Sequence, residues 1–189
     1  FRTTATRHLA AITGLPITAA SDPVAAMTDM SGYIATSQTV KNLAIHLKKA
    51  ADDLRLLNSG PHTGFDDLNV PARQAGSSIM PGKVNPTQCE AVTMAAVQVM
   101  GNDAAIGFAA SQGNFQLNVF LPVSAYNFLL SARLLADVCD SFRTHCVEGI
   151  TPNAEKMAAN LNNSLMLVTC LTPKIGYEAA AACAKKALH

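Results

Sequence analysis

Residues 40–57 read Val40-Lys-Asn-Leu-Ala-Ile-His-Leu-Lys-Lys-Ala-Ala-Asp-Asp-Leu-Arg-Leu-Leu57, and they carry the strongest periodic signal in the chain. Their apolar side chains recur at intervals of 3, 4, 3, 4 and 3 residues, at Val40, Leu43, Leu47, Ala50, Leu54 and Leu57. A mean period of roughly 3.5 residues is typical of a helix that packs along an apolar seam. We therefore expect an all-α fold, an elongated bundle of long helices.

The periodic stretch belongs to a predicted helix over residues 22–58. Asp22 is a good N-cap and Pro23 a good first helical residue, whereas Gly60-Pro61 ends the helix. Gly32 is expected to weaken this helix locally. Further helices are expected at about 86–111, 122–149, 153–162 and 177–188. Two of them carry apolar stripes, at Val92, Ala95, Val99 and Ile106, and at Phe128, Ala132, Leu135, Cys139, Phe142 and Cys146.

The composition of the 189 residues limits the function classes. Charged residues make up 14% of the chain, against roughly 25% in an ordinary soluble domain, while hydrophobic residues make up 49%. This balance excludes intrinsic disorder and indicates that an oligomer covers part of the surface. The net charge of +1 provides no field that would attract nucleic acid or an acidic membrane. No apolar run approaches the roughly 18 residues of a membrane span.

The five cysteines form an odd set without CxxC spacing, so they indicate neither a disulfide framework nor a zinc site. Cys139 and Cys146 fall on an apolar helical stripe. We interpret them as core residues of a protein in a reducing compartment.

The long irregular segment 60–85 separates the first two long helices, and its second half concentrates chemically useful groups. This half reads Gly76-Ser-Ser-Ile-Met-Pro-Gly-Lys-Val-Asn85. Two hydroxyls, one ammonium group, one amide and flexible glycines are the donors that a small dianion such as a dicarboxylate requires. The alternative is a polar surface loop. Neither GxxxxGK[ST] nor GxGxxG, the common phosphate-binding patterns, is present.

Residues 76–85 resemble the signature loop of the fumarase/aspartase superfamily. Four further segments resemble class II fumarases: Pro86-Thr-Gln-Cys-Glu90, Gln98-Val-Met-Gly-Asn-Asp103, Gly113-Asn-Phe-Gln-Leu-Asn-Val-Phe120 and Ser164-Leu-Met-Leu-Val-Thr169. The resemblance implies reversible anti addition of water to fumarate, which gives L-malate in the tricarboxylic acid cycle. It implies no metal or organic cofactor, no nucleic-acid or membrane partner, and a homotetramer with active sites shared between subunits. The implied location is the cytoplasm, or the mitochondrial matrix in a eukaryote.

The resemblance also implies roles for five residues. Ser77 matches the base that removes the C3 proton of malate, and Ser78, Lys83 and Asn85 match residues that bind substrate carboxylates. Glu90 matches a helix acid that supports catalysis through a histidine of another subunit. A serine hydroxyl is a poor base in water, so loop amides must stabilise its alkoxide in a closed site. The alternative for Glu90 is an acid favoured by the dipole at a helix start.

The resemblance further predicts how the chain is organised. Residues 1–150 are expected to be a central helical domain that lacks its N-terminal part and carries the loop 60–85. Residues 151–189 are expected to end the bundle and to begin a small C-terminal domain. None of the five histidines stands in the sequence context of the family's catalytic histidine; His62, which follows Gly60-Pro61, is expected to be a surface residue. The chain is therefore expected to be a fragment that is inactive alone.

Two other functions remain open. Aspartate ammonia-lyase shares the loop and the base, and Gln74-Ala75-Gly76 and Gln116-Leu117-Asn118 favour it slightly. Gly82, Thr87-Gln88-Cys89 and Asn114-Phe115 favour fumarase. The other alternative is a non-catalytic helical assembly protein, against which the complete set of loop residues argues.

Overall fold

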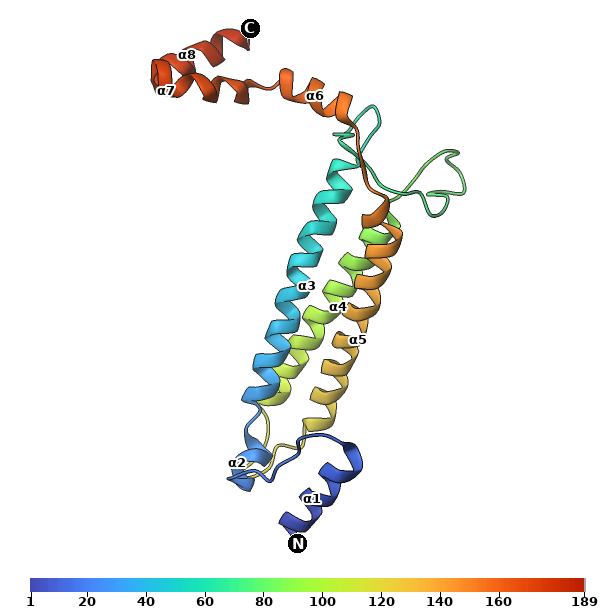
Figure 1. Cartoon of the computed structure of the whole chain (residues 1–189), viewed down its shortest axis with the longest axis vertical. Coiled ribbons are helices and arrows are strands. Elements are labelled where there is room, and N and C mark those ends of the chain that lie inside the picture. Colours follow the sequence, from blue (N-terminus) through green and yellow to red (C-terminus); the bar gives the residue numbers. More distant parts are fainter. Residues whose placement is uncertain (189) are drawn as a thin grey trace. The chain divides into compact units, whose positions relative to one another are not determined.

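The computed structural model describes residues 1–188, and it confirms the all-α fold (Figure 1). The long helices are α3 (Ser31–Leu57), α4 (Thr87–Ala110) and α5 (Leu121–His145). The shorter α-helices are α1 (Arg2–Thr13), α2 (Pro23–Thr28), α6 (Ala154–Asn162), α7 (Thr172–Ile175) and α8 (Tyr177–Ala187). Two 3₁₀ segments, η1 (Val147–Gly149) and η2 (Leu165–Leu171), and two short strands, β1 (Leu68–Asn69) and β2 (Thr151–Pro152), complete the described chain.

The chain divides into two compact units, and each long helix contributes a part to both. The first unit comprises residues 1–45 and 95–136, and the second comprises residues 46–94 and 137–188. No helix within residues 1–188 is long and apolar enough to cross a membrane.

Polar contacts join the three long helices of the first unit, where they lie side by side (Figure 1). Ser37 Oγ of α3 donates to Asp103 Oδ1 of α4 at 2.6 Å, and Lys41 Nζ forms an ion pair with the same carboxylate at 2.5 Å. Asn102 Nδ2 of α4 donates to Ser131 Oγ of α5 at 2.9 Å, and both residues are buried. The apolar pattern of the sequence does not reveal this polar layer, because polar residues are usually exposed.

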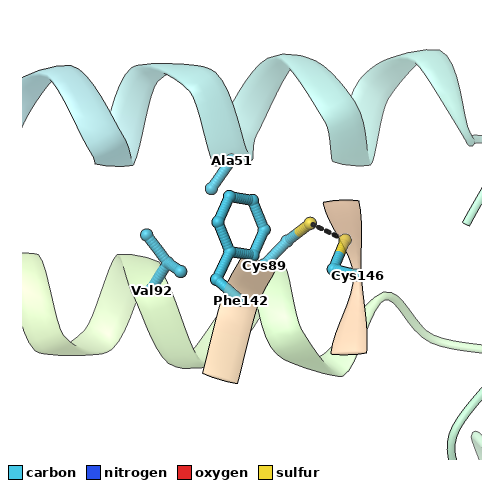
Figure 2. Packing of buried hydrophobic residues seen from close by; sticks show 5 residues of the cluster. All are labelled: Ala51, Cys89, Val92, Phe142 and Cys146. Atoms are coloured by element: carbon cyan, nitrogen blue, oxygen red, sulfur yellow. Dashed lines mark hydrogen bonds between the residues drawn. The ribbon is translucent and has the colours of Figure 1, made fainter. Parts of the chain in front are cut away.

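An apolar cluster joins the same helices in the second unit (Figure 2). Ala51 of α3 faces Cys89 and Val92 of α4, Phe142 of α5 and Cys146, the residue that follows α5, and all five side chains are buried. The two sulfur atoms lie 3.9 Å apart. The expected core position of Cys146 is thus confirmed, whereas Cys139 is only half-buried.

The predicted helix over residues 22–58 is wrong in one respect, because it is interrupted at Asp29 and Met30. Asp29 has an extended backbone, and its carboxylate accepts a hydrogen bond from the Ser31 amide at 2.9 Å. The Asp29 side chain thus satisfies the amide of the first residue of α3, which begins separately from α2. The break lies three residues before Gly32, where we expected the weakness.

The predicted seam of α3 is also corrected. Leu43 is 51% exposed and Ala50 is exposed, whereas Ser37, Ala44 and Ala51 are buried. These three side chains are small and seven residues apart, so they let neighbouring helices approach the backbone of α3 closely. The stripe of α4 is confirmed at Val92, Val99 and Ile106.

The ends of the remaining helices are close to the predicted positions. The helix expected over residues 122–149 ends earlier, at His145, and a separate 3₁₀ turn follows it. The helices expected at 153–162 and 177–188 are observed as α6 and α8. The helical segments η2 and α7 were not anticipated.

Candidate active site

The candidate loop, residues 76–85, closes on itself in the second unit. The Gly76 amide donates to the Lys83 carbonyl oxygen at 2.8 Å, and Asn85 Nδ2 donates to the Gly76 carbonyl oxygen at 3.0 Å. A Cβ atom on Gly76 would lie 2.7 Å from the Lys83 carbonyl oxygen, so this close approach requires glycine. Gly82 has a φ of +80°, which also favours glycine. The two glycines therefore shape the loop.

The Ser77 hydroxyl is held by the backbone of the same loop. Its Oγ accepts hydrogen bonds from the amides of Ile79, at 3.2 Å, and Met80, at 3.3 Å. Hydrogen bonds donated to an oxygen favour its ionised form, because the amide dipoles stabilise negative charge. Ser77 is half-buried, while Ser78 and Lys83 are exposed. The two adjacent serines therefore differ in their surroundings: Ser77 Oγ accepts hydrogen bonds from two backbone amides, whereas Ser78 is exposed.

Two contacts hold the segment before the loop against the end of α5 and the 3₁₀ turn η1 that follows it. Arg73 Nε donates to the His145 carbonyl oxygen at 2.7 Å, at a helix end where unpaired carbonyl groups accumulate negative partial charge. Pro71 packs so closely on Gly149 that a Cβ atom there would lie 2.4 Å from Pro71 Cγ. The chain before residue 76 is therefore anchored at two points.

Two adjoining hollows lie beside the loop, and three predicted site residues line them. Asn85 and Glu90 line the first, of about 460 Å³, and Glu90 lies in the first turn of α4. Lys83 lines the second, of about 620 Å³. The hollows share Asn58 as a lining residue. Ser77 is not among the lining residues of either hollow.

Arg55 is a residue of this site that the sequence analysis missed. It lies in the last turn of α3, and its Nη2 atom is 3.9 Å from Glu90 Oε1. It lines the hollow of Asn85 and Glu90. In the sequence, Arg55 follows Asp52 by three residues, which resembles an ordinary charged helix surface. No feature of the sequence shows that this surface faces α4.

The buried thiols next to the loop do not have the properties of nucleophiles. Burial, and secondarily the neighbouring Cys146, raises the pKa of Cys89 to about 12. Burial also raises the pKa of Cys146. Both thiols therefore stay protonated at neutral pH, and a protonated thiol is a weak nucleophile. Their role in the second unit is packing, although Cys89 immediately precedes Glu90.

His62 is exposed, as expected for a surface residue. Within residues 1–188, no group of three or more His, Cys, Asp or Glu side chains is arranged to hold a metal ion.

A family model described as Lyase matches residues 1–101, which is more than half of the chain. The chain belongs to this lyase family. Among curated relatives, the class II fumarate hydratase of Pseudomonas putida is 57% identical over 180 residues, covering 95% of this chain and 39% of the relative. That of Campylobacter jejuni is 62% identical over 162 residues, covering 86% of this chain and 35% of the relative. The lyase chain thus spans about two fifths of the length of these relatives.

Solved structures support the same family. A crystal structure of fumarate lyase:delta crystallin from Brucella melitensis has a TM-score of 0.89 and 42% identity, covering 97% of this chain and 43% of that one. A recombinant class II fumarase from Schistosoma mansoni has a TM-score of 0.86 and 38% identity, covering 97% and 40% respectively. The helical arrangement of this lyase chain is therefore that of known fumarate lyases.

Proposed function

We propose that the chain is the central part of a fumarate hydratase, which adds water reversibly and in anti geometry to fumarate and gives L-malate. The observation that carries this proposal is the 57% identity to a class II fumarate hydratase over 95% of the chain. That coverage includes the loop with its full set of hydroxyl, ammonium and amide groups. The substrate of this reaction is a small dicarboxylate.

Ser77 is the proposed base that takes the C3 proton of malate. Removal of this proton leaves additional negative charge on the adjacent carboxylate, and Lys83 and Asn85 are the proposed groups that stabilise it. Ser78 is the proposed additional donor to a substrate carboxylate. The two amides that donate to Ser77 Oγ support this assignment, because an alkoxide needs such donors.

Glu90 is the proposed acid that supports a catalytic histidine of another subunit. The position of its carboxylate on an open hollow with Asn85 leaves room for a group from outside this chain. A site completed by a second subunit also explains why we expect the 189-residue chain to be inactive alone.

The proposed assembly is a homotetramer that shares its active sites. The helix α4 supports it, because this helix is apolar on two sides. Val92, Val99 and Ile106 are buried within the chain, whereas Val97 and Phe108 are 59% and 75% exposed. Apolar faces of this kind usually mark protein–protein contacts. We further propose that residues 1–150 belong to the central helical domain and that 151–189 begin a small C-terminal domain.

The test is an assay of the full-length protein with L-malate and with L-aspartate, in which the absorbance of fumarate is followed. We expect fumarate from L-malate and none from L-aspartate. Fumarate from L-aspartate alone would show an aspartate ammonia-lyase instead. No turnover of either compound by a folded oligomer would favour a non-catalytic assembly protein.

The proposed location is the cytoplasm, or the mitochondrial matrix in a eukaryote. The free thiols of this chain are consistent with this location.

A further inference from the structure

Arg55 occupies a position between two carboxylates beside the candidate site. Its Nη1 atom is 3.7 Å from Asp52 Oδ1, and its Nη2 atom is 3.9 Å from Glu90 Oε1. Both distances exceed that of a hydrogen bond, so the contacts depend on charge and not on a fixed donor geometry. The side chains of Arg55 and Glu90 are 42% and 38% exposed, so solvent and salt screen part of their attraction.

The charges on α3 leave Arg55 available to Glu90. Asp52 already has a closer cation, because Lys48 Nζ lies 2.5 Å from Asp52 Oδ2. Within residues 1–188, Arg55 is the only cation that the structure places within 4 Å of the Glu90 carboxylate. The result is an alternating row of charges that begins at Lys48 and ends at Glu90.

The end of this row lies at a hollow beside the candidate site. Asn85, a proposed substrate-binding residue, lines the same hollow as Arg55 and Glu90. A glutamate side chain has several rotatable bonds, and a nearby cation restricts the positions that its carboxylate occupies. A carboxylate that must face an incoming histidine benefits from this restriction.

We propose that Arg55 is a positioning residue that holds the Glu90 carboxylate on the side of the hollow shared with Asn85. This inference rests on the proposed function, because Glu90 must take part in catalysis for its position to matter. Arg55 acts through Glu90, so its effect must disappear when the Glu90 carboxylate is absent.

The test is a double-mutant cycle in the full-length protein with Arg55→Gln, Glu90→Gln and the variant that combines them. We expect Arg55→Gln to lower kcat by about tenfold with a change in KM below about twofold. In the Glu90→Gln background, the same change at Arg55 is expected to lower kcat by less than about twofold. Arg55→Lys is expected to recover most of the activity, because the contacts depend on charge.

Lys49→Gln is the matched control, because Lys49 lies two turns before the end of α3 and forms an exposed ion pair with Asp53. This variant is expected to retain wild-type kcat, and thermal unfolding of every variant verifies the fold. The inference is overturned if Arg55→Gln retains wild-type kcat, or if its loss is the same with and without the Glu90 carboxylate. A folded Arg55→Lys enzyme that loses as much activity as Arg55→Gln would also overturn it.

The design separates this inference from the proposed function. A wild-type protein without fumarate hydratase activity contradicts the proposed function, and a fully active Glu90→Gln variant contradicts the proposed role of Glu90. Either result overturns the inference as well. An active wild type, an impaired Glu90→Gln variant and an unaffected Arg55→Gln variant contradict the role of Arg55 alone.

Discussion

Ser77 and Ser78 carry the same hydroxyl group on adjacent residues, yet the loop surrounds them differently. Ser77 is half-buried and its oxygen receives two backbone amides, whereas Ser78 is exposed. A hydroxyl with two amide donors is suited to bear negative charge. An exposed hydroxyl is suited to donate one hydrogen bond to a ligand. At the scale of single residues, this difference supports separate roles.

Replacement of the two serines tests these roles. We expect Ser77→Ala to lower kcat by about 100-fold or more, because proton removal from carbon loses its base. If Ser78 binds substrate as proposed, Ser78→Ala removes one hydrogen bond to it, which costs about 0.5–1.5 kcal/mol. Steady-state kinetics of both variants in the full-length protein, with a melting curve for each, measures the difference. A folded Ser77→Ala enzyme that keeps more than about a tenth of wild-type kcat would contradict the assignment.

Lys83 is the one cation in the loop 76–85, and its replacement tests the proposed site in a second way. If Lys83 binds substrate as proposed, Lys83→Ala removes a charge-assisted contact with a substrate carboxylate, which is worth roughly 1.5–3 kcal/mol. We expect kcat/KM to fall by at least about tenfold and KM to rise. Kinetics with both malate and fumarate measure this effect. Unchanged values for both substrates would remove Lys83 from the site.

At the scale of elements, the packing of α4 against the C-terminal end of α5 includes the buried pair Cys89 and Cys146, of which Cys146 directly follows α5 (Figure 2). Burial raises the pKa of Cys89 from its ordinary value of 9.0 to about 12, so the folded protein favours the protonated thiol. Between these two values the unfolded chain has lost this proton while the folded chain retains it. The contribution of Cys89 to stability is therefore complete below about pH 9 and is lost as the pH rises toward 12.

Thiol labelling tests this packing. At pH 8 we expect a thiol reagent to modify Cys170 and Cys183 rapidly, since both are exposed, and to leave Cys89 and Cys146 unmodified until denaturant is added. Mass spectrometry of the digested protein identifies the labelled positions. The free energy of unfolding should also decline more steeply above pH 9 in the wild type than in Cys89→Ala. Rapid labelling of Cys89 in the folded protein would show that this cluster opens readily.

At the scale of the whole molecule, the exposed apolar side chains of α4 indicate further partners. We expect the full-length protein to form a homotetramer in light scattering at micromolar concentration. Phe108→Asp places a charge on the outer face of α4 and is expected to reduce the assembly state. Tyr177→Asp is the matched control, because Tyr177 is 78% exposed on α8, a helix with several charged residues. A monodisperse wild-type monomer, or a tetramer unaffected by Phe108→Asp, would contradict this prediction.

The sequence by itself determined the class of the fold and the identity of the loop. Helix periods of 3.5 to 3.6 residues and the prolines and glycines at helix ends are local properties, so α4, α6 and α8 were predicted closely. The series of glycine, serine, lysine and asparagine in residues 76–85 likewise predicts a site for a small dianion.

Only the tertiary structure decided which residues those local elements bring together. Leu43 and Ala50 belong to a regular apolar pattern but are exposed, because small side chains at Ala44 and Ala51 set the close packing of α3. Arg55 becomes part of the site because α3 and α4 lie side by side in the second unit, more than thirty residues apart in sequence. The two amides on Ser77 Oγ depend on the path of the loop backbone. Contacts of these kinds follow from packing and backbone direction, which no single residue type specifies.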